Sequence, residues 1–306
     1  MAKSNSNIQY CQCMAKELFY ERNCCYFCQG PLTKIIDFDD GTSQQILRCN
    51  TCQLGHTRYI PTLDTIANLY EDHDARDFDP TSSAVIDKSK DLLARLQLRQ
   101  ACGDRVPKSF VDFGTGNARF AIQAKGIWPN CEVIAVDYSS QPPEHLTLYP
   151  EISFMQVDKF LSLQYKYDLI FLRHVLEHSL DPILLLKSLG SCIEGDGLIY
   201  VEVPNTNSRI QKIVKHRSVN WYVPKHILHF NRKSLQSVSE LSGFESRISK
   251  RNLPIMGDQI VQFLNATNSN VFYKILGGLT HPIQLILEIG KDRGTSISAV
   301  LKKNRR

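Results

Sequence analysis

The sequence has no hydrophobic run long enough to cross a bilayer, and no N-terminal apolar segment of the signal-peptide kind. Its longest apolar stretch, IQLILEIG from Ile283, falls well short of the ~20 residues that a membrane-spanning helix needs. We therefore expect a cytoplasmic protein without a transmembrane segment. Peripheral membrane contact through the apolar region 271–290 stays open.

A large excess of charge of one sign is also missing. Lys and Arg total 36 against 31 Asp and Glu, and part of this excess lies in the tail KKNRR from Lys302. Binding to nucleic acid calls for clustered basic residues, so the composition makes such a partner improbable. The sequence contains no internal repeat and no low-complexity tract. Its 42% apolar residues can fill one large domain plus a small one.

Cysteine, in contrast, is concentrated near the N-terminus. Seven of the ten cysteines precede residue 53, and without an export signal metal binding explains them better than disulfides. Two C-x2-C pairs flank a turn-rich insert and predict a closed tetrahedral shell for structural Zn²⁺ in a zinc-ribbon-like module over 25–60. The predicted ligands are Cys25, Cys28, Cys49 and Cys52. Participation of the neighbouring Cys11, Cys13 or Cys24 stays open.

The rest of the chain predicts an α/β domain. A partly ordered leader is expected over 1–24 and a helical connector over 61–104. From Ser109, short apolar runs alternate with helical stretches, which predicts βαβ units and a doubly wound, mostly parallel sheet. The expected strands are SFVDF, CEVIAVD, ISFMQVD, YDLIFLRH and GLIYVEVP. Runs from Phe244 and Ser296 would close one sheet edge, and a helical insertion over about 254–292 would be broken at Pro282.

The loop in FVDFGTGNARF follows the first of these strands. Gly114 and Gly116 lack Cβ atoms and let backbone N–H groups approach a ligand. Asp137 ends the next strand, where a carboxylate can accept both hydroxyls of a ribose, so the ligand would be NAD or an adenosyl compound. Asp112 beside the loop and Asp158 at the end of the third strand would repel a pyrophosphate. These acids favour the cationic methionine portion of S-adenosylmethionine (SAM).

These segments resemble class I SAM-dependent methyltransferases, through VDFGTGNARF, VIAVDYS and MQVD. The resemblance implies a Rossmann-like methyltransferase domain over 105–306, in which Ala118 departs from the glycine of many members. Asp137 would hold the ribose, Tyr138 would pack on the adenine and Asp158 would lie near the adenine amino group. The full set of expected cofactor-binding residues is Asp112, Gly114, Thr115, Gly116, Asp137, Tyr138, Asp158 and Arg173.

The segment FLRHVLEHSLDP, from Phe171, is the most specific part of the sequence. His174, Glu177 and His178 are spaced i, i+3 and i+4, which places them on one face if the segment is a helix. By itself, H-x-x-E-H also matches an inverted zinc-protease motif. Because the segment begins at the end of an apolar strand, we favour its resemblance to the HVLEHxxDP signature. This signature marks a branch that includes small-molecule O-methyltransferases and sugar methyltransferases.

A second histidine-rich stretch, WYVPKHILHFNRKSLQSVSELSGFE, extends the resemblance to that branch. Methyl transfer to oxygen or carbon needs alignment and a base for the acceptor proton, without a metal. His226 is the first choice for this base and His174 the second, whereas His178 and His229 are expected to pack. In some sugar C-methyltransferases an acid precedes the histidine that matches His226. Lys225 stands there in this chain, which favours O-methylation.

The sequence therefore predicts methyl transfer from SAM to a sugar, nucleotide sugar or cell-surface glycan. The stretch CQLGHTRYIPTLDTIANLYED is similar to zinc-ribbon methyltransferases of polysaccharide pathways. The alternative is an rRNA or tRNA methyltransferase whose ribbon binds RNA, but the ribbon carries few basic residues: Lys34, Arg48 and Arg58. A degenerate scaffold is disfavoured by the intact glycine loop. The acceptor and the oligomeric state stay open.

Overall fold

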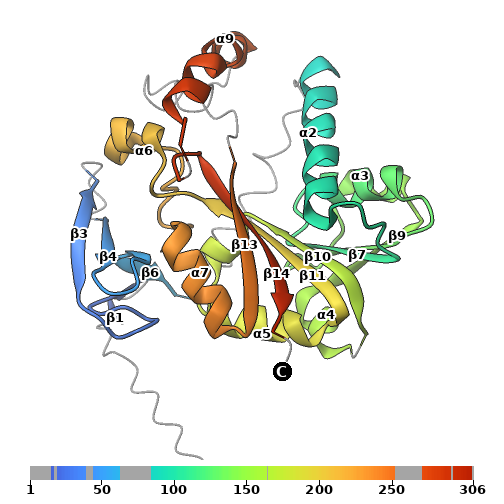
Figure 1. Ribbon diagram of the computed structural model, residues 1–306, viewed down its shortest axis with the longest axis horizontal. Helices are drawn as coiled ribbons and strands as arrows, with labels where there is room; N and C mark the ends of the chain where they lie inside the picture. The colour runs from blue at the N-terminus through green and yellow to red at the C-terminus, as the bar shows by residue number, and fades with distance from the viewer. Residues whose placement is uncertain are drawn as a thin grey trace, which may run out of the picture.

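The computed structural model (Figure 1) describes residues 15–16, 19–38, 44–62, 84–163, 165–251, 271–290 and 292–304. Most of the predicted leader, including Cys11 and Cys13, lies outside these residues. The same holds for 63–83 of the predicted connector and for 252–270 of the predicted insertion.

The centre of the molecule is a seven-stranded sheet in the order β13-β14-β11-β10-β7-β8-β9. The five strands from β11 to β9 are parallel, as predicted, while β14 runs antiparallel to both β11 and β13 at one edge. Their bounds are β7 Ser109–Phe113, β8 Glu132–Asp137, β9 Ile152–Gln156, β10 Tyr167–Arg173, β11 Ile193–Pro204, β13 Phe244–Arg251 and β14 Ser296–Lys303.

Helices cover both faces of this sheet, and the alternation of side chains along β7 explains the two cores. Phe110 packs in a cluster with Leu98 and Ala121, whereas Val111 and its neighbours on the other face pack with Leu186. The helices are α2 Ala84–Cys102, α3 Arg119–Ile127, α4 Val157–Ser162, α5 Pro182–Ser191, α6 Arg209–Val214, α7 Arg232–Leu241 and α9 Val271–Leu287. Short 3-10 turns are η1 Glu144–Leu148, η2 Leu176–His178 and η3 Lys215–Arg217.

Helix α9 corrects one prediction, because it continues through Pro282 instead of breaking there. A proline removes a single N–H donor, and the turns after it keep theirs, as the bond from Glu288 N to Gln284 O shows (3.0 Å). Large apolar side chains that α9 and the residues after it expose are Leu279, Ile283, Leu285, Ile286 and Ile289. Among the described helices, none combines the length and hydropathy that a bilayer crossing requires.

Glu288, the first residue after α9, allows a test of how burial changes the pKa of a carboxyl group. Its carboxylate is fully buried and accepts hydrogen bonds from Ser208 Oγ (3.4 Å) and Gln284 Nε2 (3.5 Å). Burial raises its pKa to about 7 from an ordinary value of 4.5. A raised acid pKa means that the folded state loses stability as pH rises from 4.5 to 7, because the unfolded chain ionises first.

We expect Glu288→Gln to leave the free energy of unfolding nearly unchanged at pH 4.5 and to raise it by about 1–3 kcal/mol at pH 8. Urea unfolding of both proteins across this range measures the difference. Asp112 also has a pKa raised by burial, but its contribution is common to both proteins and cancels. A difference that is constant with pH would contradict the prediction.

A smaller sheet, ordered β12-β5-β4-β3, lies beside α7 (Figure 1). One cysteine pair precedes β3, and the other stands at and just after the end of β4. We call the described residues between Cys25 and Ile60 the cysteine module. Its strands are β3 Leu32–Asp37, β4 Gln45–Cys49, β5 Gly55–Thr57 and β6 Tyr59–Pro61, and β6 also pairs with β2 Phe19–Glu21, which pairs with β1 Ala15–Lys16. The small sheet takes its fourth strand, β12 Leu228–His229, from the other half of the chain, whereas β6 belongs to the sheet with β1 and β2. The module is therefore completed by the segment that follows His226.

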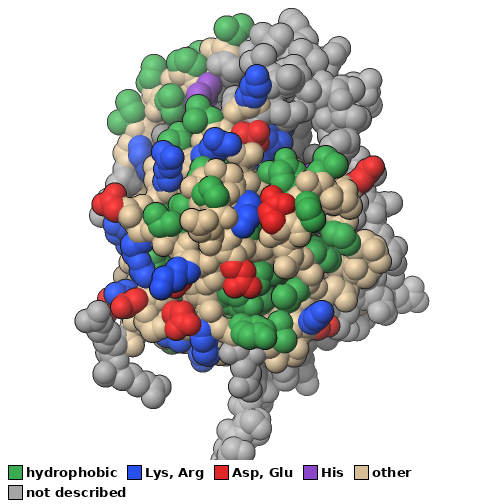
Figure 2. Space-filling model, turned by 90° about the vertical axis from the view of Figure 1, so that its right-hand side faces the viewer, with side chains coloured by type: hydrophobic (Ala, Val, Ile, Leu, Met, Phe, Trp, Pro, Cys, Tyr) green, Lys and Arg blue, Asp and Glu red, His purple; other side chains and the backbone are tan. Residues whose placement is uncertain are grey.

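The surface seen in Figure 2 carries Lys, Arg, Asp and Glu side chains interspersed with apolar ones. Ion pairs between side chains of opposite charge also occur elsewhere on the surface. Arg119 lies 2.5 Å from Asp91, and Lys302 lies 3.3 Å from Asp196. On this face the charges are mixed in sign, as the composition predicts.

Candidate active site

The glycine loop joins the end of β7 to the start of α3 and is tied to the end of β8. The amides of Gly114 and Thr115 both donate to Val136 O, at 2.8 and 2.9 Å. The amide of Gly116 donates to Asp137 Oδ2 at 2.9 Å. The loop and the acid predicted from the sequence spacing are thus brought together at the carboxyl edge of the sheet, where ligands bind in such folds.

The two glycines have different surroundings, although both have positive φ angles, 74° for Gly114 and 51° for Gly116. A Cβ on Gly114 would lie 2.4 Å from Cγ2 of Val175. A Cβ on Gly116 would meet nothing within 4 Å. Gly114 therefore packs the loop against the HVLEH segment, and Gly116 faces open space.

This difference predicts unequal costs for two alanine substitutions. Gly114→Ala combines a left-handed backbone with a steric clash and should lower the free energy of unfolding by about 2–4 kcal/mol. Gly116→Ala is the matched control. It has only the left-handed backbone and no clash, and should lower the free energy of unfolding by about 1–2 kcal/mol. Chemical unfolding without ligand measures both. Adding Val175→Ala to Gly114→Ala should recover part of the loss; strictly additive effects would refute the clash.

Asp112 lies in β7 just before the glycine loop, where the sequence places it. It is buried, and its Oδ2 accepts hydrogen bonds from Thr115 Oγ1 (2.7 Å) and Ala121 N (3.0 Å). Burial raises the pKa of Asp112 to about 7. The carboxyl and the Thr115 hydroxyl thus brace the loop from within. Ala118, where many family members have glycine, adopts the left-handed region with φ 56° and is fully buried.

The predicted adenine-side residues lie beyond β8 and β9. Tyr138 is 67% exposed, and its amide donates to Asp137 Oδ1 at 2.8 Å. The prediction that Asp158 ends the third strand is wrong, because β9 stops at Gln156 and Asp158 lies in the first turn of α4. Gln156 is still extended and serves as the N-cap residue, so the helix begins two residues earlier than the apolar pattern suggests.

The prediction that HVLEH forms one helix face is also wrong. His174 has φ 54° and its amide still bonds to Glu202 O of β11 (2.9 Å), so the chain turns sharply before the 3-10 turn η2. The side chains nevertheless meet, with His174 Nδ1 2.9 Å from Glu177 Oε1. Glu177 is 1% exposed and His174 is 30% exposed. The result is a histidine held by a buried carboxylate and accessible from outside.

His226 and His229 lie deeper. His226 Nδ1 is 3.0 Å from Asn220 O, and burial lowers the pKa of its imidazole well below the usual range. The Thr57 hydroxyl donates to His226 O (2.6 Å), so it can only accept from His229 Nε2 at 2.9 Å. Burial also lowers the pKa of His229 to about 3. His229 is therefore a neutral hydrogen-bond donor within the structure.

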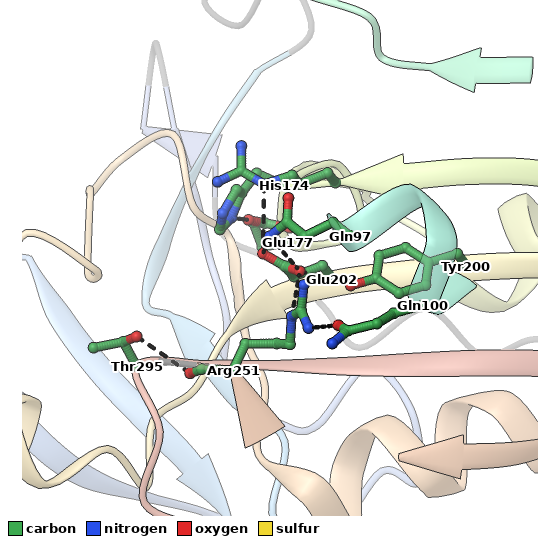
Figure 3. A network of polar contacts seen from close by, with 9 residues as sticks. Gln97, Gln100, His174, Glu177, Tyr200, Glu202, Arg251 and Thr295 are labelled. Carbon is green, nitrogen blue, oxygen red and sulfur yellow. Dashed lines mark hydrogen bonds and ion pairs between the residues drawn. The ribbon is translucent and has the colours of Figure 1, made fainter. Parts of the chain in front are cut away.

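Sequence reasoning missed Glu202, the centre of a polar network at the same edge (Figure 3). This fully buried carboxylate accepts from Tyr200 Oη (2.7 Å) and lies 3.4 Å from Gln97 Nε2. The Nε atoms of Arg173 and Arg251 are each 3.4 Å from its oxygens. The one available signal was a charged residue inside the apolar run GLIYVEVP. Glu202 joins α2, β10, β11 and β13 beside His174.

The four predicted metal ligands meet in the cysteine module. Their sulfurs lie within 4.8 Å of one another, with 3.5 Å between Cys25 and Cys52 and 3.4 Å between Cys28 and Cys49. Four sulfurs bound to Zn²⁺ at 2.3 Å would be separated by about 3.8 Å. Backbone amides at 51 and 52 donate to Cys49 Sγ, and His56 Nε2 is 3.2 Å from Cys25 Sγ. The donor set fits a thiolate-bound metal.

The module contacts both histidine segments. Tyr26 donates its hydroxyl proton to Asp181 Oδ2 at 2.5 Å, just after HVLEH. A Cβ on Gly55 would lie 2.8 Å from His229 Cβ, and Thr57 bonds to His226 O. The module thus supports the backbone on both sides of the histidines.

A family model described as a methyltransferase domain matches residues 85–247, more than half of the chain. The chain belongs to this methyltransferase family. The match runs from α2 into β13 and so includes the glycine loop and all four histidines discussed above, but not the cysteine module. The protein is a SAM-dependent methyltransferase with the α/β fold predicted from its sequence.

The chain is similar to solved structures of methyltransferases. The plantazolicin methyltransferase BpumL, in complex with a triazolic desmethylPZN analog and SAH, is 18% identical with a TM-score of 0.50, over 78% of this chain and 93% of that one. A SAM-dependent methyltransferase from Archaeoglobus fulgidus is 22% identical with a TM-score of 0.45, over 70% and 94%. The comparison with curated proteins gave no match.

Proposed function

We propose that this methyltransferase transfers the methyl group of SAM to a hydroxyl oxygen of a sugar, nucleotide sugar or cell-surface glycan, with His174 as the base. The acceptor oxygen attacks the methyl carbon, the sulfur keeps the electron pair of the broken S–C bond, and the hydroxyl proton passes to His174 Nε2. The observation that carries this proposal is the 2.9 Å contact between His174 Nδ1 and Glu177 Oε1. It supports a base beside the glycine loop.

The geometry supports His174 over His226, the first choice from sequence. The side chain of His174 is 30% exposed, whereas that of His226 is 10% exposed. Because Nδ1–H of His174 donates to a carboxylate, Nε2 carries the lone pair that accepts a proton. The buried Glu177 also stabilises the imidazolium that forms. An imidazole that is exposed to solvent and held in one orientation can take a proton from an acceptor that approaches from the solvent side.

On the donor side, we propose that Gly116 and Asp137 contact SAM directly, because the Cα of Gly116 faces open space and Asp137 lies against it. Tyr138, with its exposed ring, would stack on adenine. Asp112 and Thr115 would act indirectly, by bracing the loop. The remaining proposed donor contacts are Gly114, Asp158 and Arg173.

We further propose that the four clustered cysteines bind structural Zn²⁺, which makes the cysteine module a zinc-ribbon-like unit. Sugar and glycan acceptors are supported by the resemblance of HVLEHSLDP and of the sequence after the second cysteine pair to the sugar-methyltransferase branch.

Calorimetry with SAM and SAH, followed by incubation with methyl-labelled SAM and an acceptor panel, tests the proposal. The panel includes nucleotide sugars, glycans, a peptide and tRNA or rRNA fragments. Label on a sugar oxygen is expected. Label on RNA would instead support the alternative function, label on a sugar carbon would exclude O-methylation, and failure to bind either SAM or SAH would refute the donor assignment.

A further inference from the structure

We propose that Glu177, His178 and His226 form a second metal site, which binds one divalent transition-metal ion of the Zn²⁺, Co²⁺ or Ni²⁺ type. One ligand atom from each residue lies within 4.8 Å of the others. Glu177 and His178 come from η2, and His226 lies on a segment 49 positions further along the chain. This inference is independent of the proposed acceptor and of the cysteine module.

Both imidazoles are oriented as metal ligands usually are. His178 Nδ1 is 3.0 Å from Lys225 O, and His226 Nδ1 is 3.0 Å from Asn220 O. A carbonyl oxygen can only accept, so Nδ1 carries the proton in each ring and Nε2 carries the lone pair. Donation of the second ring nitrogen to a backbone carbonyl is the outer-shell contact typical of metal-bound histidines.

Glu177 supplies the negative ligand. Its side chain is 1% exposed, and Oε1 accepts from His174 Nδ1. Within the described part of the chain, Oε2 is buried and receives no hydrogen bond. Leaving a carboxylate oxygen buried without a partner is costly, and a bound cation would remove that cost.

The spacing and the donor types select the class of metal. His226 Nε2 lies 3.9 Å from Glu177 Oε1, whereas ligands about 2.1 Å from one ion are separated by about 3.0–3.4 Å. Binding one ion between these two atoms therefore shortens the distance between them by less than about 1 Å. Two imidazoles and one carboxylate suit Zn²⁺, Co²⁺ or Ni²⁺ better than Mg²⁺ or Ca²⁺, which prefer oxygen. Three protein ligands leave a position for water or an acceptor oxygen.

Metal content of the full chain tests this site directly. Protein stripped of metal and reloaded with Zn²⁺ should lose about one equivalent per chain when His178 is replaced with alanine, because three ligands become two. His216→Ala, a histidine on η3 outside the cluster, is the matched control and should bind as much Zn²⁺ as the wild type. Near-ultraviolet circular dichroism verifies that each variant is folded.

Loading with Co²⁺ separates the two sites, since only the cysteine module gives thiolate charge-transfer absorption. His178→Ala should keep this absorption and lose visible bands that lack thiolate character. Glu177→Gln should weaken the same bands. Unchanged Zn²⁺ content and an unchanged Co²⁺ spectrum in folded His178→Ala would overturn the proposal and indicate that a proton, shared among these residues, balances Glu177.

Discussion

Replacing His174 with alanine is expected to lower the single-turnover rate of methyl transfer by about 10²–10⁴-fold, while the affinity for SAM changes little. The variant removes the group that we propose accepts the acceptor proton. Among the described residues, the hydrogen bonds of His174 go to Glu177 and Glu202 and not to the glycine loop that would hold the donor. Its backbone bond from the amide to Glu202 O is retained. Calorimetric titration with SAM and rapid-quench measurement of product distinguish the two effects.

His216→Ala serves as the control and should transfer methyl groups at the wild-type rate. Glu177→Gln should fall between the two, because the amide keeps an oxygen near His174 Nδ1 but removes the negative charge that stabilises the imidazolium. Full turnover in His174→Ala, together with a loss of turnover but not of fold in His226→Ala, would return the role of base to His226.

Loss of the Zn²⁺ ion that we propose for the cysteine module should have the other large effect. We expect Cys49→Ser to release the ion and to reduce methyl transfer to a few per cent or less, since a structural Zn²⁺ site contributes an apparent 10–16 kcal/mol in small domains. The loss reaches the active site because β5 pairs with β12, and Thr57 holds the backbone at His226. Without β5, the carbonyl oxygens of His226 and Ile227 lose the hydrogen bonds that Thr57 donates to them.

A colorimetric chelator measures the released metal, and hydrogen exchange at residues 226–229 reports the local opening. Cys131→Ala is the matched control, because this buried cysteine lies outside the cluster. It should keep both metal and transfer. If Cys49→Ser lost its metal but kept normal exchange and turnover, the module would not support the histidines.

Local patterns in the sequence were sufficient for the central sheet. The run SISAVLKK became β14 and SFVDF became β7 without a shift, because short runs that contain apolar β-branched and aromatic residues favour a strand locally. The glycine spacing likewise brought Gly116 against Asp137, as the expected turn requires. The cysteine cluster could be predicted because two C-x2-C pairs, separated by a short insert, are typical of a four-thiolate metal site.

Contacts between segments that are far apart in the sequence could not be predicted from such local patterns. The pairing of β5 with β12 and the approach of His226 to Glu177 depend on tertiary packing, which leaves no periodic trace in either segment. HVLEH has the spacing of a helix, yet the strand bond from His174 to Glu202 outweighs that tendency. Glu202 itself looked like one polar residue in an apolar strand, and its two arginine partners, Arg173 and Arg251, come from two separate strands, β10 and β13.

The position of β12 also bears on how the chain folds during synthesis. Thr57 bonds to His226, which lies 169 positions later in the chain. Strand β5 therefore has no partner on this side until residues 226–229 have emerged from the ribosome. Contacts this distant in sequence slow folding. A fragment that stops before Leu228 would keep an unpaired strand edge, which is a template for aggregation. The cysteine module is thus not an independent folding unit. Grafting it onto another protein would also require the segment that contains β12.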